Sequence, residues 1–372
     1  MTIYDRLAAW SEQARTEAAP TSLPPEAYTD HNLAELERER VMRRGWINVA
    51  HISQLAAPGD YVTFEIVDHP VLAVHGVDGV LRAFSNVCPH RSAIIADGCG
   101  NRTVFRCPYH AWTYDLSGKL IGAPHMDKDA VRDIRLKELK FEVWQGLVIV
   151  NLDVTAAPLA SDLAFLEERI APLHFERQKV VRSGVMEIAC NWKVLVENFC
   201  ESYHLFCVHV DTLEKSTPSI TNEMLPGGPG FNHHMARTNS EPSHRWAERL
   251  GLPQERWDEA HLICIYPATV INLKGNNAIW LSIQPVSPGT LRAHWWYTLM
   301  PEDDGSVSED DIALGENTIK TFMAEDEAVI ATVQKGLAAG TGNRAPLHHW
   351  ESTNVKFGQY LADRLSPVDP VA

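Results

Sequence analysis

The sequence has no long apolar run, no surplus of basic residues and no cysteine pattern of a disulfide scaffold. No segment of its 372 residues approaches the roughly 20 apolar residues of a membrane-spanning helix, and the first residues lack the features of a secretory signal. Lys and Arg number 33 against 48 Asp and Glu, so the net charge of −15 argues against binding nucleic acid or an anionic membrane. Seven Cys, an odd number in a long chain, favour a reducing compartment, and we therefore expect a cytoplasmic protein.

The chain length and the changes in sequence pattern predict two domains that follow an N-terminal segment. Residues 1–44 read as an arm or loop to about residue 30, followed by a charged helix that opens at Asp30 and packs on the second domain. Short alternating runs separated by turn signals predict a compact antiparallel β domain over 45–155. Residues 156–372 mix predicted strands (180–188, 268–273, 278–284, 291–299) with predicted helices (158–178, 191–204, 309–337, 350–365), and 214–258 reads as mostly irregular. The fold class is therefore α+β.

Two short motifs in the β-rich stretch carry the first chemical signal. Cys88-Pro-His90 and Cys107-Pro-Tyr-His110 each supply one thiolate and one imidazole, with 16 residues between His90 and Cys107. A zinc finger places two thiolates in one knuckle and two imidazoles in the other. One of each in every loop instead suits a [2Fe-2S] cluster in which one iron takes two thiolates and the other takes two imidazoles. A structural zinc site is the alternative.

The segments next to these two motifs allow two further predictions. The segment that begins at Tyr114 and contains Ser117-Gly118 reads as a hairpin on which the second loop sits. Cys99 lies between the two loops, and the second loop has no further Cys to pair with it. We expect Cys99 to be a free, buried thiol.

A second group of candidate metal ligands includes His204 and His209. On a regular helix two residues five apart are rotated by about 140°, so these imidazoles converge only where the helix ends or distorts. A mononuclear ferrous site takes two His and one carboxylate. Asp326 lies in register with the apolar face of the predicted 309–337 helix, where an unpaired carboxylate is costly, whereas Glu325 and Glu327 are rotated toward solvent. Pairing of Asp326 with a Lys or Arg is the alternative to a ligand role.

The pattern Cys-x-His-x16-Cys-x2-His is followed by the pair His204 and His209. This order and spacing of motifs closely resembles that of the Rieske-type non-haem iron oxygenases of bacteria over nearly the whole chain. The resemblance implies an N-terminal antiparallel β Rieske domain and a C-terminal helix-grip domain, an antiparallel sheet wrapped on a long helix. It places a [2Fe-2S] Rieske cluster on the four residues of the first motifs. It also implies a mononuclear Fe(II) held by His204, His209 and Asp326.

The same resemblance makes Glu201 the acidic residue that links the two metal centres. Its carboxylate would bond His204 of its own chain and a cluster-ligating His, by inference His110, of a neighbouring subunit. Such an interface implies a cyclic homotrimer. Many members carry Asp at this position, and the spacing from Asn198 to Glu201 is that of the monooxygenase and demethylase branches, where Glu recurs among oxygenases of quaternary ammonium compounds. Asn198 and Glu201 are our candidate catalytic-site residues.

The resemblance implies a terminal oxygenase that hydroxylates or oxidatively demethylates a small aromatic or N-methylated substrate with O2. Electrons would come from a separate NAD(P)H-dependent flavin and iron–sulfur reductase, directly or through a ferredoxin, because no nicotinamide or flavin fingerprint is evident in this chain. A ring-dihydroxylating α subunit is the alternative within the enzymes. A non-catalytic electron-transfer or redox-sensing protein and a zinc-stabilised binding module are the alternatives outside them.

The substrate pocket is expected between residues 200–235 and the strands of 268–299. Polar and aromatic candidates on those strands are Asn272, Asn276, Asn277, Trp280, Trp295 and Trp296. Core packing is the competing interpretation for each of them. A tryptophan in the pocket could stack on an aromatic ring or enclose a trimethylammonium group.

Overall fold

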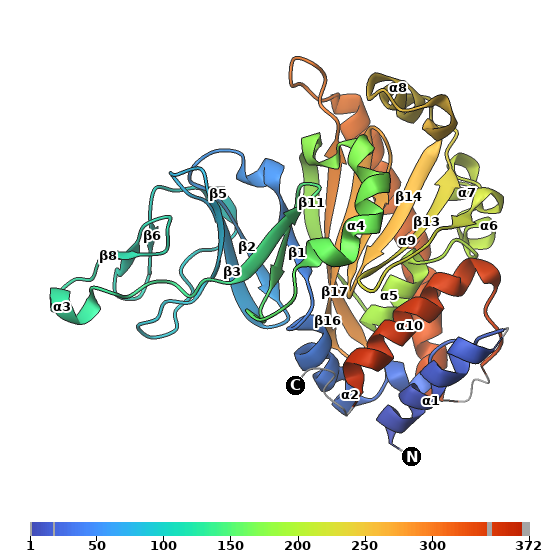
Figure 1. Ribbon diagram of the computed structural model, residues 1–372, viewed down its shortest axis with the longest axis horizontal. Coiled ribbons are helices and arrows are strands. Elements are labelled where there is room, and N and C mark those ends of the chain that lie inside the picture. Colours follow the sequence, from blue (N-terminus) through green and yellow to red (C-terminus); the bar gives the residue numbers. More distant parts are fainter. Residues whose placement is uncertain (1, 18, 341–343, 367–372) are drawn as a thin grey trace. The chain divides into compact units, whose positions relative to one another are not determined.

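The computed structural model describes residues 2–17, 19–340 and 344–366. The chain forms two compact units, one of residues 43–158 and one that joins the residues up to Met42 with those from Leu159 onward (Figure 1). No described helix combines the length and the apolarity that a bilayer span requires.

The unit of residues 43–158 consists of small antiparallel sheets, as the alternating sequence pattern predicts. Its sheets have the orders β1-β10-β9, β4-β3-β2-β5 and β6-β7-β8. The strands are β1 (Ile47–His51), β2 (Asp60–Ile66), β3 (His69–His75), β4 (Leu81–Ser85), β5 (Cys99–Asn101), β6 (Phe105–Arg106), β7 (Thr113–Tyr114), β8 (Leu120–Gly122), β9 (Lys140–Trp144) and β10 (Leu147–Asn151), with one short helix, α3 (Lys128–Val131). The predicted hairpin is present as β7 and β8, where Asp115 Oδ1 accepts the backbone N–H groups of Ser117 and Lys119.

An aromatic cluster forms the core beneath the two Cys-and-His motifs. Tyr61 and Phe105 meet edge to face with ring centroids 5.4 Å apart, and Cys88 and Cys107 lie in the same buried cluster. Cys99 is a free thiol, as expected, but the expectation that it is buried is wrong, because the thiol is exposed. Cys99 lies on the short edge strand β5, of which every residue is exposed.

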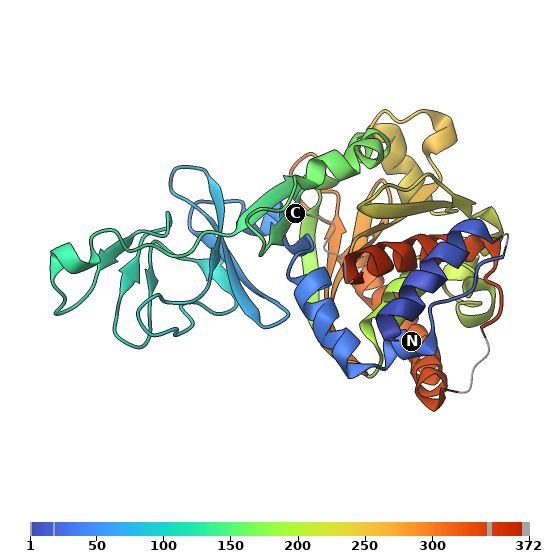
Figure 2. The same ribbon diagram turned by 60° about the horizontal axis from the view of Figure 1, so that its bottom comes forward.

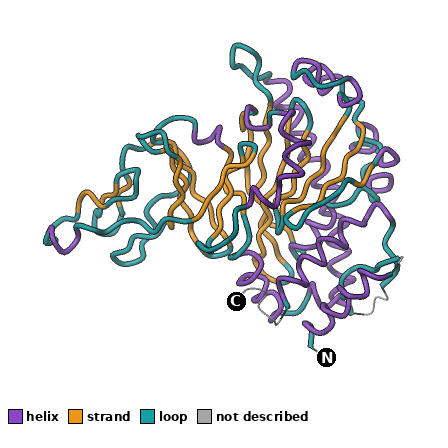
Figure 3. Tube along the Cα trace, in the orientation of Figure 1, coloured by secondary structure: helices purple, strands orange, loops and turns teal. Residues whose placement is uncertain are grey.

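The larger unit contains a seven-stranded antiparallel sheet of order β11-β17-β16-β15-β14-β13-β12 (Figure 3). Its strands are β11 (Lys179–Ile188), β12 (Glu223–Met224), β13 (Phe231–Arg237), β14 (Glu259–Ile265), β15 (Thr269–Leu273), β16 (Asn277–Ser287) and β17 (Thr290–Leu299). The interpretation of 214–258 as mostly irregular is wrong, because β13 and a helix lie within it. Nearly all of β13 is buried, including His233 and His234, so the strand shows no polar–apolar alternation in the sequence.

Helices surround this sheet (Figures 1 and 3). They are α1 (Ile3–Thr16), α2 (His31–Glu37), which continues as a π-helical turn (Arg38–Met42), α4 (Leu159–Ile170), α5 (Trp192–Phe199), α6 (Leu205–Val208), α7 (Leu213–Ser216), α8 (Glu241–Arg249), α9 (Glu309–Ala339) and α10 (Ser352–Leu365). The predicted α+β fold, with an antiparallel sheet and a long C-terminal helix, is confirmed.

The N-terminal arm is helical rather than irregular. Thr2 and Asp5 form a reciprocal capping box at the start of α1, which satisfies its first free backbone donors. The helix lies beside α10 (Figure 2), where the Trp10 ring packs against Gly358 and Arg15 pairs with Asp363. Its stability therefore depends on a partner more than 300 residues away, which the local composition does not reveal.

Candidate metal centres and substrate cavity

The break between α5 and α6 brings the two histidines together. The helix predicted over 191–204 ends at Phe199, and α6 begins only at Leu205, so His204 precedes α6 and His209 follows it. Glu201 explains the break, because its carboxylate accepts the backbone N–H groups of Tyr203 and His204. These side-chain bonds replace helical backbone bonds and turn the chain.

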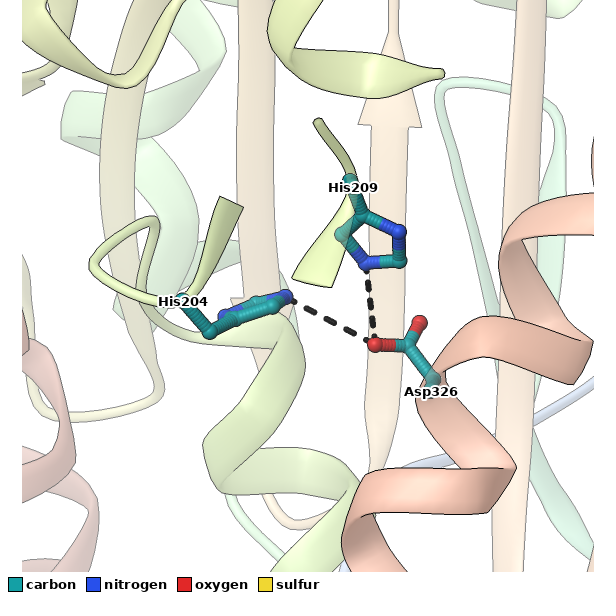
Figure 4. Close-up of side chains that lie close together, drawn as sticks. All are labelled: His204, His209 and Asp326. Carbon is teal, nitrogen blue, oxygen red and sulfur yellow. Dashed lines mark hydrogen bonds and ion pairs between the residues drawn. The ribbon is translucent and has the colours of Figure 1, made fainter. Parts of the chain in front are cut away.

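His204, His209 and Asp326 point toward one another from the two ends of α6 and from α9 (Figure 4). Their ligand atoms lie within 4.8 Å of one another. Asp326 Oδ1 is 3.0 Å from His209 Nε2 and 3.6 Å from His204 Nε2. Ligand atoms on one face of an octahedron with bonds of about 2.1 Å lie roughly 3 Å apart, so two imidazoles and a carboxylate in this arrangement fit a ferrous ion that keeps open positions.

Glu201 and Asn198 hold this cluster from the α5 side. Glu201 is 8% exposed and hydrogen-bonds His204 Nδ1, which leaves Nε2 of the same ring for the cluster. Asn198 Nδ2 donates to Asp326 Oδ1 over 3.2 Å. The two candidate catalytic-site residues therefore contact the two sides of the cluster, and the expected bond between Glu201 and His204 of one chain is present.

Glu325 has a role that the sequence pattern did not reveal. Its Oε2 lies 2.7 Å from His209 Nδ1 and accepts the Thr212 hydroxyl over 2.7 Å, so the expectation that this carboxylate faces solvent is wrong. Helical periodicity could not identify it, because both partners come from the segment after α6. Burial lowers the pKa of His209, but the carboxylates of Asp326 and Glu325 outweigh burial and leave this pKa above its usual value. The His209 side of the cluster is therefore strongly anionic.

The two Cys-and-His loops have the same backbone turn. Ser92 N–H bonds Cys88 O over 2.9 Å in the first loop, and Ala111 N–H bonds Cys107 O over 3.1 Å in the second. Ser92 and Ala111, four residues after their Cys, both have a positive φ, 55° and 57°, which closes each loop as a tight knuckle. The sequence spacing alone does not show this repeated turn.

The donor atoms of these loops suit a buried cluster. Cys88 and Cys107 are 1% and 2% exposed, and the His90 and His110 rings lie with centroids 4.6 Å apart. His90 Nδ1 is buried without a hydrogen-bond partner among the described residues, as a nitrogen reserved for a metal would be. Two buried thiols and two adjacent imidazoles match the mixed ligand set of a Rieske cluster.

Comparison with known proteins shows the families of both domains. The Rieske [2Fe-2S] domain family matches residues 45–142, and the family described as the ring hydroxylating alpha subunit (catalytic domain) matches residues 175–367, more than half of the chain. The carnitine monooxygenase oxygenase subunit of Acinetobacter pittii is 31% identical over 324 residues, which cover 85% of each chain. The chain belongs to the Rieske non-haem iron oxygenases.

Other similar proteins span several activities. The carnitine monooxygenase oxygenase subunit of Escherichia coli K12 is 31% identical over 85% of this chain and 84% of its own. The benzene 1,2-dioxygenase subunit alpha of Pseudomonas putida is 32% identical over 49% of this chain and 43% of its own. A crystal structure of the quaternary ammonium Rieske monooxygenase CntA with an inhibitor superposes with a TM-score of 0.83 at 26% identity, covering 95% of this chain and 98% of that one.

Membership of this family establishes the class of the protein. It is an oxidoreductase of the Rieske oxygenase type with a [2Fe-2S] Rieske cluster and a mononuclear iron. The family works with reductase partners and forms oligomers.

A cavity of about 290 Å³ adjoins the mononuclear site of the oxygenase. Asn272, Asn276 and Asn277 line it, together with His204, His209 and Asp326. The three tryptophan candidates are not among its lining residues. Trp280 is fully buried and stacks on Trp296 with centroids 5.5 Å apart, so these two rings belong to the core of the sheet. Trp295 packs against Gly184 on the neighbouring strand β11.

Replacing Glu325 with Gln should weaken iron binding at the His209 site. Gln keeps the size of Glu325 but loses the charge that holds His209 Nδ1–H, so the affinity for Fe(II) is expected to fall about 10- to 100-fold. Iron titration of the apo site, followed by colorimetric iron analysis, measures this change. Glu327→Gln, on the exposed face of α9, is the matched control, and equal iron affinities in the two variants would contradict the positioning role of Glu325.

Proposed function

We propose that the oxygenase is a terminal monooxygenase that oxidises a small N-methylated compound, with quaternary ammonium compounds as the first substrates to test. Cys88, His90, Cys107 and His110 would hold the Rieske cluster, and His204, His209 and Asp326 would hold the mononuclear Fe(II). The observation that carries the proposal is the convergence of these last three side chains on the wall of a cavity of substrate size.

The iron, when bound, supplies the site at which O2 is activated by electrons from the cluster. The chain's own residues prepare that site. Glu201 fixes the tautomer and orientation of His204, Glu325 does the same for His209, and Asn198 orients Asp326. Phe199, Leu262 and Phe322 give the cavity apolar wall segments beside the cluster.

Two sequence features favour a monooxygenase over a ring-dihydroxylating enzyme. Glu201 stands where many members carry Asp, and Asn198 precedes it by three residues, a spacing of the monooxygenase and demethylase branches. Similarity to two carnitine monooxygenase subunits extends over 85% of the chain, whereas the similarity to the benzene dioxygenase subunit covers 49%. A ring-dihydroxylating activity remains the second candidate.

We further propose a cyclic homotrimer in which Glu201 of one subunit bonds His110 of its neighbour. One CntA structure is described as giving insight into inter-subunit electron transfer, and the head-to-tail contact that such a path needs closes by rotation. Electrons would come from an NAD(P)H-dependent reductase, directly or through a ferredoxin. A cytoplasmic location fits this partner and the odd number of Cys.

A reconstituted assay tests the proposed function. The oxygenase, a surrogate reductase, NADH and O2 are incubated with carnitine, glycine betaine, benzene or benzoate, and the products are identified by mass. We expect an N-methylated compound to gain one oxygen atom or lose a methyl group, with one NADH consumed per product. Two oxygen atoms added to an arene would favour the dioxygenase, and a purified protein without product in a single turnover would favour the electron-transfer alternative.

A further inference from the structure

Among the described residues that line the cavity, Lys274 is the one Lys or Arg. It follows strand β15 directly and contributes to the same wall as Asn272, two residues earlier. Among the described residues no carboxylate or other side chain forms an ion pair or hydrogen bond with the Lys274 ammonium group. Its backbone is satisfied separately, because its N–H donates to Asn277 O over 2.9 Å and its carbonyl accepts from Gln178 Nε2.

The surroundings of Lys274 make an unpaired charge costly. Burial lowers the pKa of Lys274 to about 8, and no neighbouring carboxylate opposes that effect. The ammonium group is therefore still mostly protonated at neutral pH, in a partly desolvated position. A buried cation without a counter-ion is rare in proteins unless a ligand supplies the opposite charge.

Three asparagines near Lys274 in the sequence line the same cavity. Asn272 Oδ1 is buried and has no hydrogen-bond partner within the described parts of the chain. Asn276 and Asn277 are linked to each other, and Asn276 Oδ1 also accepts the hydroxyl of Ser243. The Asn272 amide nitrogen can donate a hydrogen bond, so an ammonium group and this amide on one wall match a group with one negative charge and acceptor oxygens.

The sheet register and the cavity lining relate this group to the iron site. His234, Leu262 and Asn272 are paired across three adjacent strands, so Asn272 lies two strand spacings, roughly 10 Å, from His234. His204, His209 and Asp326 line the same cavity as Asn272 and Lys274. One ligand in this cavity can therefore contact Lys274 with one end and face the iron site with the other.

We propose that Lys274, with the amide of Asn272, binds a carboxylate group of the substrate and holds the reacting carbon, several bonds away, at the iron site. This proposal rests on the proposed function and narrows its substrate class to carboxylates. An uncharged arene or a simple amine would leave Lys274 without a counter-ion. The carboxylate would also fix which methyl or methylene group faces the iron.

Paired ligands test the Lys274 subsite without any turnover. The dissociation constants of glycine betaine and choline, and of benzoate and benzyl alcohol, are measured by calorimetry on the anaerobic, iron-loaded oxygenase. Each pair differs in the carboxylate. In at least one pair we expect the carboxylate to bind about tenfold or more tightly than the alcohol that lacks this group, and Lys274→Met to weaken the carboxylate about 10- to 100-fold while the alcohol stays within about twofold.

Two further variants separate charge from packing. Lys274→Arg should keep most of the preference for the carboxylate, and Lys335→Met, at an exposed position of α9, should leave it unchanged. Wild-type protein that shows no preference for a carboxylate in either pair, or a preference that survives Lys274→Met, overturns the subsite. A carboxylate that binds through Lys274 but is never oxidised supports the subsite and contradicts the proposed function, whereas oxidation of the alcohols alone does the opposite.

Discussion

Replacing Asp326 with Ala is expected to abolish turnover while the absorption spectrum of the Rieske cluster stays intact. Asp326 Oδ1 is the atom on which His204 and His209 converge, and its removal takes one of three candidate ligands from the mononuclear site. The four candidate cluster ligands lie in the other compact unit of the chain, so their environment should not change. Iron content should fall from about three to about two per chain, with two labile sulfides retained.

Several measurements distinguish a ligand from a structural carboxylate in this experiment. The variant is compared with Glu327→Ala, one residue further along α9 and exposed. Asp326 is 3% exposed and also accepts a hydrogen bond from Asn198, so thermal unfolding is followed in both variants. Full iron content together with product formation in Asp326→Ala would show that another residue is the third ligand. Asp326→Glu, which keeps the carboxylate, should recover part of the iron.

The sequence predicted those parts of the sites that depend on residue type and spacing. Both Cys-and-His loops, the two histidines and Asp326 were found because metal sites require particular donors, and helical register placed Asp326 on a buried stripe. The break of the helix after Phe199 was also foreseeable in principle, because His204 and His209 cannot share one face of an unbroken helix. Its position could not be read, since it depends on the side chain of Glu201 bonding to the backbone.

What the sequence could not predict depends on contacts between distant segments. Glu325 reaches His209 only because α9 crosses the segment after α6, and α1 is helical partly because α10 covers Trp10. The tryptophans of β16 and β17 were candidates for the cavity, but strand alternation and sheet packing place Trp280 on the opposite, filled face with Phe175. Lys274 could not be predicted as a binding residue, because the sequence does not show whether the fold gives a single lysine an ion-pair partner.

Replacing Glu201 with Gln is expected to slow electron transfer between the cluster and the mononuclear iron while both centres remain loaded. The Glu201 carboxylate accepts two backbone N–H groups and the His204 Nδ1–H, and under the proposed trimer it also bonds His110 of a neighbouring subunit. Gln presents one donor and one acceptor in place of two acceptors, so at least one of these bonds is lost. We expect cluster reoxidation in a single turnover, followed by stopped-flow absorbance, to slow about 10- to 100-fold.

Comparing the iron content of Glu201→Gln with its rate of cluster reoxidation shows which of two roles Glu201 has. If Glu201 only shapes the turn before α6, the Gln variant should lose iron in proportion to activity, and the rate per bound iron should equal that of the wild type. If Glu201 connects the two centres, iron content should stay constant while the rate per iron falls. Glu201→Asp keeps the charge that other members of the family use at this position and should therefore be faster than Glu201→Gln. An unchanged rate of cluster reoxidation in Glu201→Gln would remove Glu201 from the electron path, even though its contact with His204 remains.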